Sequence, residues 1–91
     1  MNMLIVAYDL NKESKRPPIV EEIKKYEWAR LSESAYAIRT NQSPNDVYER
    51  LAGFIDQDDN IYILHIHRPW MGFGRKPVVD WLDKHLTACR R

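Results

Sequence analysis

The chain has 91 residues and a formal net charge of +1, and 44% of its residues are hydrophobic while 30% are charged. This balance predicts one globular domain over residues 1–91, and it excludes a disordered chain or one that binds nucleic acid by bulk positive charge. A single cysteine, Cys89, cannot form an internal disulfide, and no apolar run is long enough to span a membrane. We therefore expect a cytoplasmic protein with no membrane contact.

The first predicted element is a strand from Met3 to Tyr8. Its residues carry no charge and run directly into Asp9. An uninterrupted apolar run of this length is typical of a strand with both faces buried. The pattern therefore predicts that this strand delivers one carboxylate to the end of a sheet.

A helix and two strands are predicted next. Pro17 and Pro18 stand where a first helical turn tolerates proline, and apolar residues at helical spacing follow as far as Tyr26. Two short strands are expected over residues 28–31 and 34–40, with Tyr36 and Ile38 on one face of the second.

The second half of the chain repeats this order. Ser43 and Pro44 mark a helix start, and apolar residues continue at helical spacing from Val47 to Ile55. A strand is expected over residues 61–67, and Pro77 opens a last helix that runs to Leu86.

The resulting order is β-α-β-β-α-β with an additional C-terminal helix. Two split βαβ units of this length predict an α+β, ferredoxin-like sandwich. Right-handed crossovers then give an antiparallel sheet with strand order 4-1-3-2.

Both faces of this sheet read as apolar, although two helices can cover only one of them. The first and last strands place hydrophobic residues on both sides, whereas a half-exposed sheet should alternate apolar and polar residues. Either the last helix folds back over the second face or a second copy covers it. We expect a homodimer, which also adds stability to a domain this small.

Several short motifs resemble one known family. They are Ala7-Tyr8-Asp9, Ser34-Ala35-Tyr36, Arg68-Pro69-Trp70 and Trp81-Leu82. Together with the element order they resemble the small CRISPR adaptation protein, the dimeric ferredoxin-fold partner of the spacer integrase, and most of all the SinR-like branch of that superfamily. The VapD toxin ribonucleases are more distant relatives.

The resemblance implies an activity as well as a fold. Some members of the superfamily are metal-dependent endonucleases, with the aspartate that ends the first strand as metal ligand, and only Asp9 carries that role over. Other members are structural dimers. The basic first helix of CRISPR members is weaker here, because Lys15-Arg16 precede the helix and Lys24-Lys25 end it.

Asp9 is the leading candidate for a catalytic and metal-binding residue. The predicted topology gathers other polar residues at the same sheet edge, namely Ser32, Glu33, Ser34, Asp58 and Asp59. Oxygen ligands on such a rim suit Mg²⁺, which could activate a water molecule. Alternatively, Asp9 accepts hydrogen bonds from backbone amides of its own loop. Asp58 and Asp59 are expected to form a solvated turn.

Two other features have both a functional and a structural reading. His65 and His67 could ligate zinc only with a third ligand, and they should lie far from Asp9, so we expect surface or interface residues. The segment 68–76 could hold nucleic acid through Arg68, Trp70, Phe73, Arg75 and Lys76. Its aromatic residues could instead anchor the loop. Trp28 and Trp81 are expected in the core.

Two functions therefore stay open. The first is a small dimeric endoribonuclease of the CRISPR adaptation and SinR-like superfamily, with Mg²⁺ at Asp9. The second is a non-catalytic dimer that binds RNA, DNA or a protein partner in an antiviral defence, toxin–antitoxin or phage context.

Overall fold

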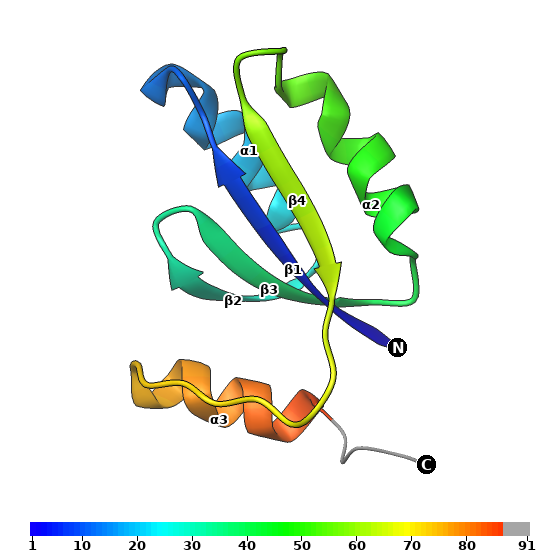
Figure 1. Cartoon of the computed structure of the whole chain (residues 1–91), viewed down its shortest axis with the longest axis vertical. Helices are drawn as coiled ribbons and strands as arrows, with labels where there is room; N and C mark the ends of the chain where they lie inside the picture. Colours follow the sequence, from blue (N-terminus) through cyan, green and yellow to red (C-terminus); the bar gives the residue numbers. More distant parts are fainter. Residues whose placement is uncertain (87–91) are drawn as a thin grey trace.

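The computed structural model describes residues 1–86, which form one four-stranded sheet with helices on both faces (Figure 1). The elements in chain order are β1 (Asn2–Asp9), η1 (Glu13–Lys15), α1 (Arg16–Ile23), β2 (Glu27–Ser32), β3 (Ala35–Thr40), α2 (Pro44–Leu51), η2 (Ala52–Phe54), β4 (Asn60–His65) and α3 (Lys76–His85).

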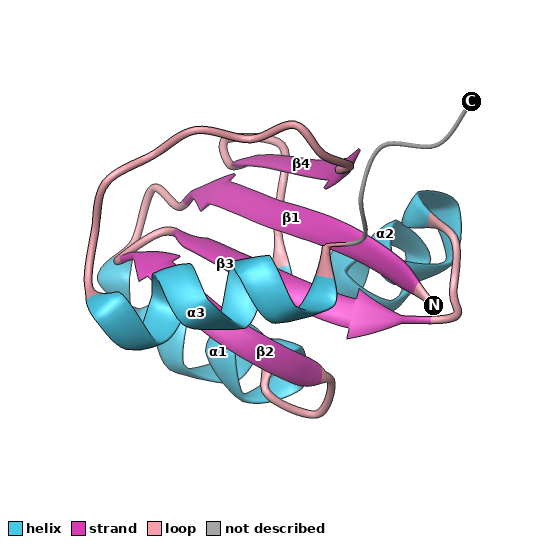
Figure 2. Ribbon diagram, turned by 90° about the horizontal axis from the view of Figure 1, so that it is seen from below, coloured by secondary structure: helices cyan, strands magenta, loops and turns pink. Residues whose placement is uncertain are grey.

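The sheet has the order β2-β3-β1-β4, and every neighbouring pair is antiparallel. This is the predicted order 4-1-3-2 read from the other edge, so the ferredoxin-like α+β fold is confirmed. The helices α1 and α2 cover one face, here called the first face, and α3 lies against the second face (Figure 2). No helix of the described residues is long and apolar enough to cross a membrane.

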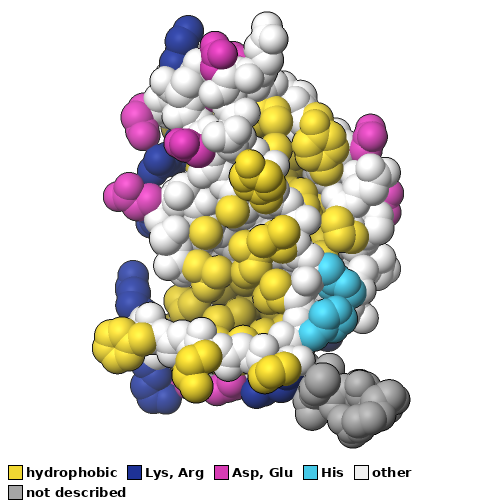
Figure 3. Space-filling model, in the orientation of Figure 1, with side chains coloured by type: hydrophobic (Ala, Val, Ile, Leu, Met, Phe, Trp, Pro, Cys, Tyr) yellow, Lys and Arg dark blue, Asp and Glu magenta, His cyan; other side chains and the backbone are white. Residues whose placement is uncertain are grey.

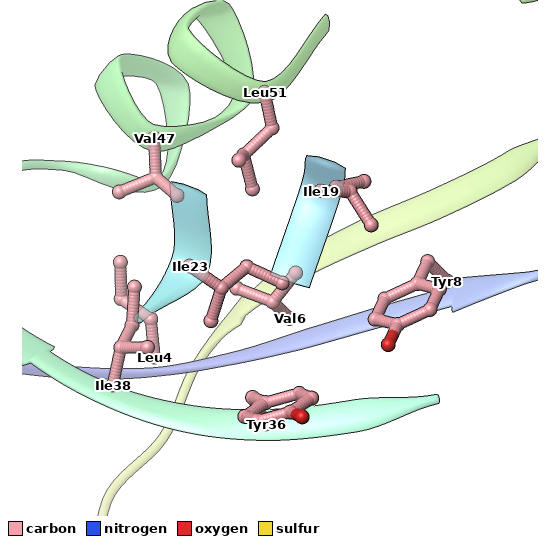
Figure 4. Close-up of a cluster of buried hydrophobic side chains, with 9 residues drawn as sticks. All are labelled: Leu4, Val6, Tyr8, Ile19, Ile23, Tyr36, Ile38, Val47 and Leu51. Atoms are coloured by element: carbon pink, nitrogen blue, oxygen red, sulfur yellow. The ribbon is translucent and has the colours of Figure 1, made fainter. Parts of the chain in front are cut away.

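The first face carries the main core. Alternate residues of β1 and β3 point toward α1 and α2, because successive side chains of a strand point to opposite faces. The buried cluster consists of Leu4, Val6, Tyr8, Ile19, Ile23, Tyr36, Ile38, Val47 and Leu51 (Figure 4). The apolar residues that the sequence places at helical spacing in α1 and α2 therefore do supply the helix side of this core.

Local chemistry sets the helix ends. The Ser43 side chain accepts a hydrogen bond from the Asp46 N–H while the Asp46 carboxylate accepts one from the Ser43 N–H, so α2 begins with a capping box. The helix α1 ends at Ile23, three residues before the predicted end. Tyr26 lies beyond it and donates its hydroxyl proton to the Gln42 side chain.

The second face is covered by α3 over only part of its area. Met3, Ala37, Leu82 and Leu86 form a second buried cluster. Polar contacts with two side chains, those of Arg68 and Glu27, hold the C-terminal end of α3. Arg68 donates to the carbonyl oxygens of Asp83 and Leu86, and His85 Nε2 lies 3.2 Å from a carboxylate oxygen of Glu27.

The remaining part of the second face is open. The side chains of Tyr62 and Leu64 are 61% and 52% exposed, and their β1 neighbours Ala7 and Ile5 are half-buried. These four residues are called the open patch, and hydrophobic side chains gather there in Figure 3. The last helix thus covers part of the face for which we expected a second copy, and the homodimer stays a prediction.

The expectation that Trp28 lies in the core is wrong. Trp28 is 38% exposed, because β2 is an edge strand. The Lys24 ammonium lies 4.6 Å from the centre of its indole ring. Trp81 is half-buried and packs against the second cluster.

Candidate metal site at the end of the first strand

Asp9 is the last residue of β1, and its side chain is exposed. It pairs with Asn60 at the start of β4. Strand alternation places it on the second face with Ile5 and Ala7. A hollow at this end of the sheet is lined by Ala7, Tyr8, Asp9, Asn60 and Tyr62. Since Ala7 and Tyr62 also belong to the open patch, Asp9 borders that patch directly.

Within residues 1–86, the Asp9 carboxylate forms no hydrogen bond or ion pair with another protein group. The alternative reading, in which Asp9 accepts hydrogen bonds from amides of its own loop, is therefore not what the structure shows. A carboxylate without protein partners at an exposed strand end has its oxygens available for a cation.

Asp59 makes the loop contacts that the sequence suggested for Asp9. Its side chain has no exposed surface and accepts hydrogen bonds from the backbone N–H groups of Asn11, at 2.8 Å, and Asp56, at 2.9 Å. These hydrogen bonds, followed by that from the Lys15 ammonium, lower the pKa of Asp59 from 3.8 to about 2. The expectation of a solvated turn is wrong for Asp59, although Asp58 is exposed.

Lys15 is the centre of this arrangement. Its Nζ donates to Asn11 Oδ1 at 2.7 Å, Asp56 Oδ2 at 2.6 Å and Asp59 Oδ2 at 2.9 Å. The pKa of Lys15 is raised, first by its hydrogen bond to Asp56. Sequence reasoning missed this cluster, because Lys15 and Asp59 are 44 positions apart and no local pattern connects them.

The turn between β2 and β3 lies at the same end of the sheet, as expected. The Tyr8 N–H donates to the carbonyl oxygen of Ser34, and the Tyr8 hydroxyl donates to that of Glu33. The Glu33 carboxylate faces Arg16 at 3.7 Å. Among the described residues, no group of three or more His, Cys, Asp or Glu side chains could hold a metal ion. Among the described residues that line the hollow, Asp9 is the one that carries a carboxylate.

The histidines lie at the other end of the sheet, as predicted. His65 pairs with Leu4, whereas Asn60 pairs with Asp9. Five residues along a strand separate the two ends by about 16 Å. The rings of His65 and His67 are in edge contact, with centroids 4.4 Å apart. This separation excludes either imidazole as a proton acceptor for chemistry at Asp9 of the same chain.

The loop from residue 66 to residue 75 is anchored at its beginning. The Arg68 guanidinium holds the end of α3, with Nε 2.7 Å from the Leu86 carbonyl oxygen and Nη2 3.0 Å from Asp83 Oδ1. Trp70 packs against the second cluster. Arg68 and Trp70, two of the predicted nucleic-acid contacts, therefore anchor the loop in this structure.

The rest of this loop is exposed. Phe73 and Met71 are fully exposed, at 105% and 96%. Arg75 precedes the first turn of α3, and Lys76 pairs with Asp80 at 3.0 Å. Nucleic-acid binding therefore stays a prediction, and Phe73, Arg75 and Lys76 are the predicted contacts that are exposed.

The fold and the site together define a class of protein. A ferredoxin-like sheet with two crossover helices on one face carries a free aspartate at the end of an internal strand. The chain belongs to the family described as CRISPR associated protein Cas2, whose family model matches residues 1–72. The helix α3 lies beyond the matched residues.

Two solved structures are similar in fold. The hypothetical protein TT1823 from Thermus thermophilus is 20% identical, with a TM-score of 0.68 over 81% of this chain and 92% of its own. Streptococcus pyogenes Cas2 is 21% identical, with a TM-score of 0.56 over 96% of this chain and 99% of its own. None of the curated proteins matches the chain.

Proposed function

We propose that this CRISPR adaptation protein is a homodimer that binds Mg²⁺ between two Asp9 carboxylates and cleaves RNA. The observation that supports the proposal best is that Asp9 has no protein partner among the described residues and borders the open patch. An interface on that patch would bring the same aspartate of each copy toward one axis, because a twofold interface uses the same surface on both copies.

The exposed side chains support dimerisation through the open patch. Tyr62 and Leu64 project from β4 with more than half of their surface in water. Their β1 neighbours Ile5 and Ala7 are also apolar. Contiguous apolar surface of this kind marks interaction sites in soluble proteins.

Carboxylate chemistry supports the metal. Two Asp9 side chains that approach each other repel unless a proton or a cation lies between them. Mg²⁺ uses one or two protein carboxylates and retains several water ligands, so one aspartate from each copy is sufficient. A bound metal would lower the pKa of a coordinated water molecule and stabilise charge on a phosphate group.

A second function is supported by what surrounds Asp9. The histidines lie at the opposite end of the sheet, and the described residues hold no cluster of three potential metal ligands. A non-catalytic dimer that binds RNA, DNA or a protein partner needs neither feature. Under both functions we place the protein in the cytoplasm. The second function belongs to an antiviral defence, toxin–antitoxin or phage context.

Cleavage assays separate the two functions. The chain, an Asp9→Asn variant and an Asp58→Asn control are incubated with labelled RNA and DNA, with Mg²⁺ or Mn²⁺ and with a chelator. Asp58 is also acidic and exposed, but it lies in the loop before β4 and not at the end of β1. Cleavage that requires both the metal and Asp9 supports the enzyme. Binding without cleavage supports the second function, and equal cleavage by the Asp9→Asn variant contradicts a catalytic Asp9.

The dimer is tested separately. A Leu64→Lys substitution adds a charge to the open patch, so we expect a smaller species by light scattering and sedimentation at micromolar concentration. The matched control is Tyr48→Lys, because Tyr48 is 43% exposed but lies on α2, over the first face. A wild-type chain that is monomeric under these conditions would contradict the proposed interface.

A further inference from the structure

The loop that follows β1 is fastened by a buried charge. The Asp59 carboxylate has no exposed surface, and it accepts hydrogen bonds from Asn11, Asp56 and Lys15 at 2.8–2.9 Å. Removing a carboxylate from water is costly unless charged and polar partners replace the water. The structure supplies three such donors, so this side chain is held in one place.

The partners of Asp59 come from two separate parts of the chain. Asn11 and Lys15 belong to the segment between β1 and α1, whereas Asp56 and Asp59 belong to the segment that leads into β4. The Lys15 ammonium adds a second connection through Asp56, at 2.6 Å. These contacts therefore connect the segment after β1 to the segment before β4.

Asp9 lies next to both of the connected segments. It is two residues before Asn11, and its strand partner Asn60 directly follows Asp59. Its own carboxylate has no partner in residues 1–86, so only its backbone is held. We propose that Asp59 and Lys15 are positioning residues for Asp9, which fix the direction in which its carboxylate leaves the sheet.

This inference rests on the proposed metal site and adds two residues to it. A protein binds a metal ion more tightly when the coordinating residue is already held in place, because less conformational entropy is then lost on binding. Residues that support metal ligands typically change the affinity by 10–100-fold when they are removed. An effect on metal binding is therefore expected without any contact between Asp59 or Lys15 and the metal.

The first test is a titration with Mn²⁺, followed by electron paramagnetic resonance and calorimetry. Wild-type protein is compared with Lys15→Met and Asp59→Asn variants at a temperature where each is fully folded by circular dichroism. The affinity of the variants should fall by about tenfold. The matched control is Glu22→Gln, which removes a 2.6 Å ion pair with Arg50 near the end of α1, and it should bind Mn²⁺ like the wild type.

A second readout needs no metal. Amide hydrogen exchange should become faster at Asn11 in the Lys15→Met variant, while the amides of Leu4 and Val6 in the middle of β1 keep their protection. A wild-type chain that binds no Mn²⁺ contradicts the proposed metal site. If the wild type binds Mn²⁺ and the Lys15→Met variant binds it equally well, the positioning role is wrong. An equal loss in the Glu22→Gln control would likewise overturn it, because the effect would then follow from general destabilisation.

Discussion

The two faces of the sheet are built from the same strands but are covered to very different degrees. On the first face, two helices bury alternate residues of β1 and β3, and Leu4, Val6 and Ile38 have no exposed surface. On the second face, α3 covers part of the sheet and leaves the open patch in water.

This difference separates stability from function. Among residues 1–86, the largest fully buried side chains all belong to the core cluster of the first face, which consists of aliphatic residues and two tyrosines. The second face carries Asp9, the open patch and the exposed end of the loop before α3. The comparison leads us to expect that substitutions on the first face unfold the protein, whereas those on the second face change what it binds.

The largest effect is expected for Leu51→Ala. Leu51 is fully buried between α2 and the sheet, so its loss removes apolar contacts and leaves a cavity. The free energy of unfolding should fall by about 2–5 kcal/mol in urea denaturation. Tyr48→Ala on the exposed side of the same helix is the control. A loss below about 1 kcal/mol for Leu51→Ala would mean that the first face repacks freely.

A smaller and local effect is expected for Leu82→Ala. Leu82 is 8% exposed and belongs to the second cluster. Its loss should weaken the docking of α3 by about 2 kcal/mol. Faster amide exchange should be confined to α3, with protection in β1 unchanged. Global unfolding of this variant at the same denaturant concentration as Leu51→Ala would show that the two faces are not independent.

Acid should loosen the end of the sheet near Asp9 before it affects the first face. Asp59 has a pKa of about 2 in the folded chain against an ordinary value of 3.8. Because the folded-state pKa is lowered, its contribution to stability is present above pH 3.8 and is lost as the pH falls toward 2. Amide signals of Asn11 and Asp56 followed by NMR should report this transition.

The control for the acid transition is Asp59→Asn, which cannot ionise. Its Asn11 signal should lack the change between pH 3.8 and about pH 2, whereas the Asp56 signal still follows the Asp56 carboxyl group, whose own pKa is lowered, first by its hydrogen bond from Lys15. If the transition at Asn11 persists in this variant, another carboxylate is responsible for it.

The smallest effect is expected for Asp83→Asn. The carboxylate of Asp83 pairs with Arg68 at 3.0 Å, and its side chain is 55% exposed. Half-exposed ion pairs contribute at most about 1 kcal/mol. Arg68 also retains its bonds to the carbonyl oxygens of Asp83 and Leu86. If this variant releases α3 as strongly as Leu82→Ala in hydrogen exchange, charge rather than burial holds the helix.

The site shows the limit of sequence reasoning more clearly than the fold does. The position of Asp9 at a strand end follows from the apolar run before it, and the antiparallel order places it opposite the start of the last strand, whereas the pairing with Asn60 is known only from the structure. The loop-fastening role, however, belongs to Asp59. Asp58 and Asp59 are neighbours in the same polar loop, but only Asp59 is buried, and two of its three partners, Asn11 and Lys15, lie far away in the sequence.

The sequence alone determined the elements, the strand order and the apolar character of both faces. These depend on local periodicity, helix capping and the handedness of crossovers, which act over short stretches of chain. Only the tertiary structure decided how much of the second face α3 covers and which aspartate is left free. Both depend on contacts between residues far apart in the chain, such as Arg68 with Leu86 and Lys15 with Asp59, and no local pattern encodes them.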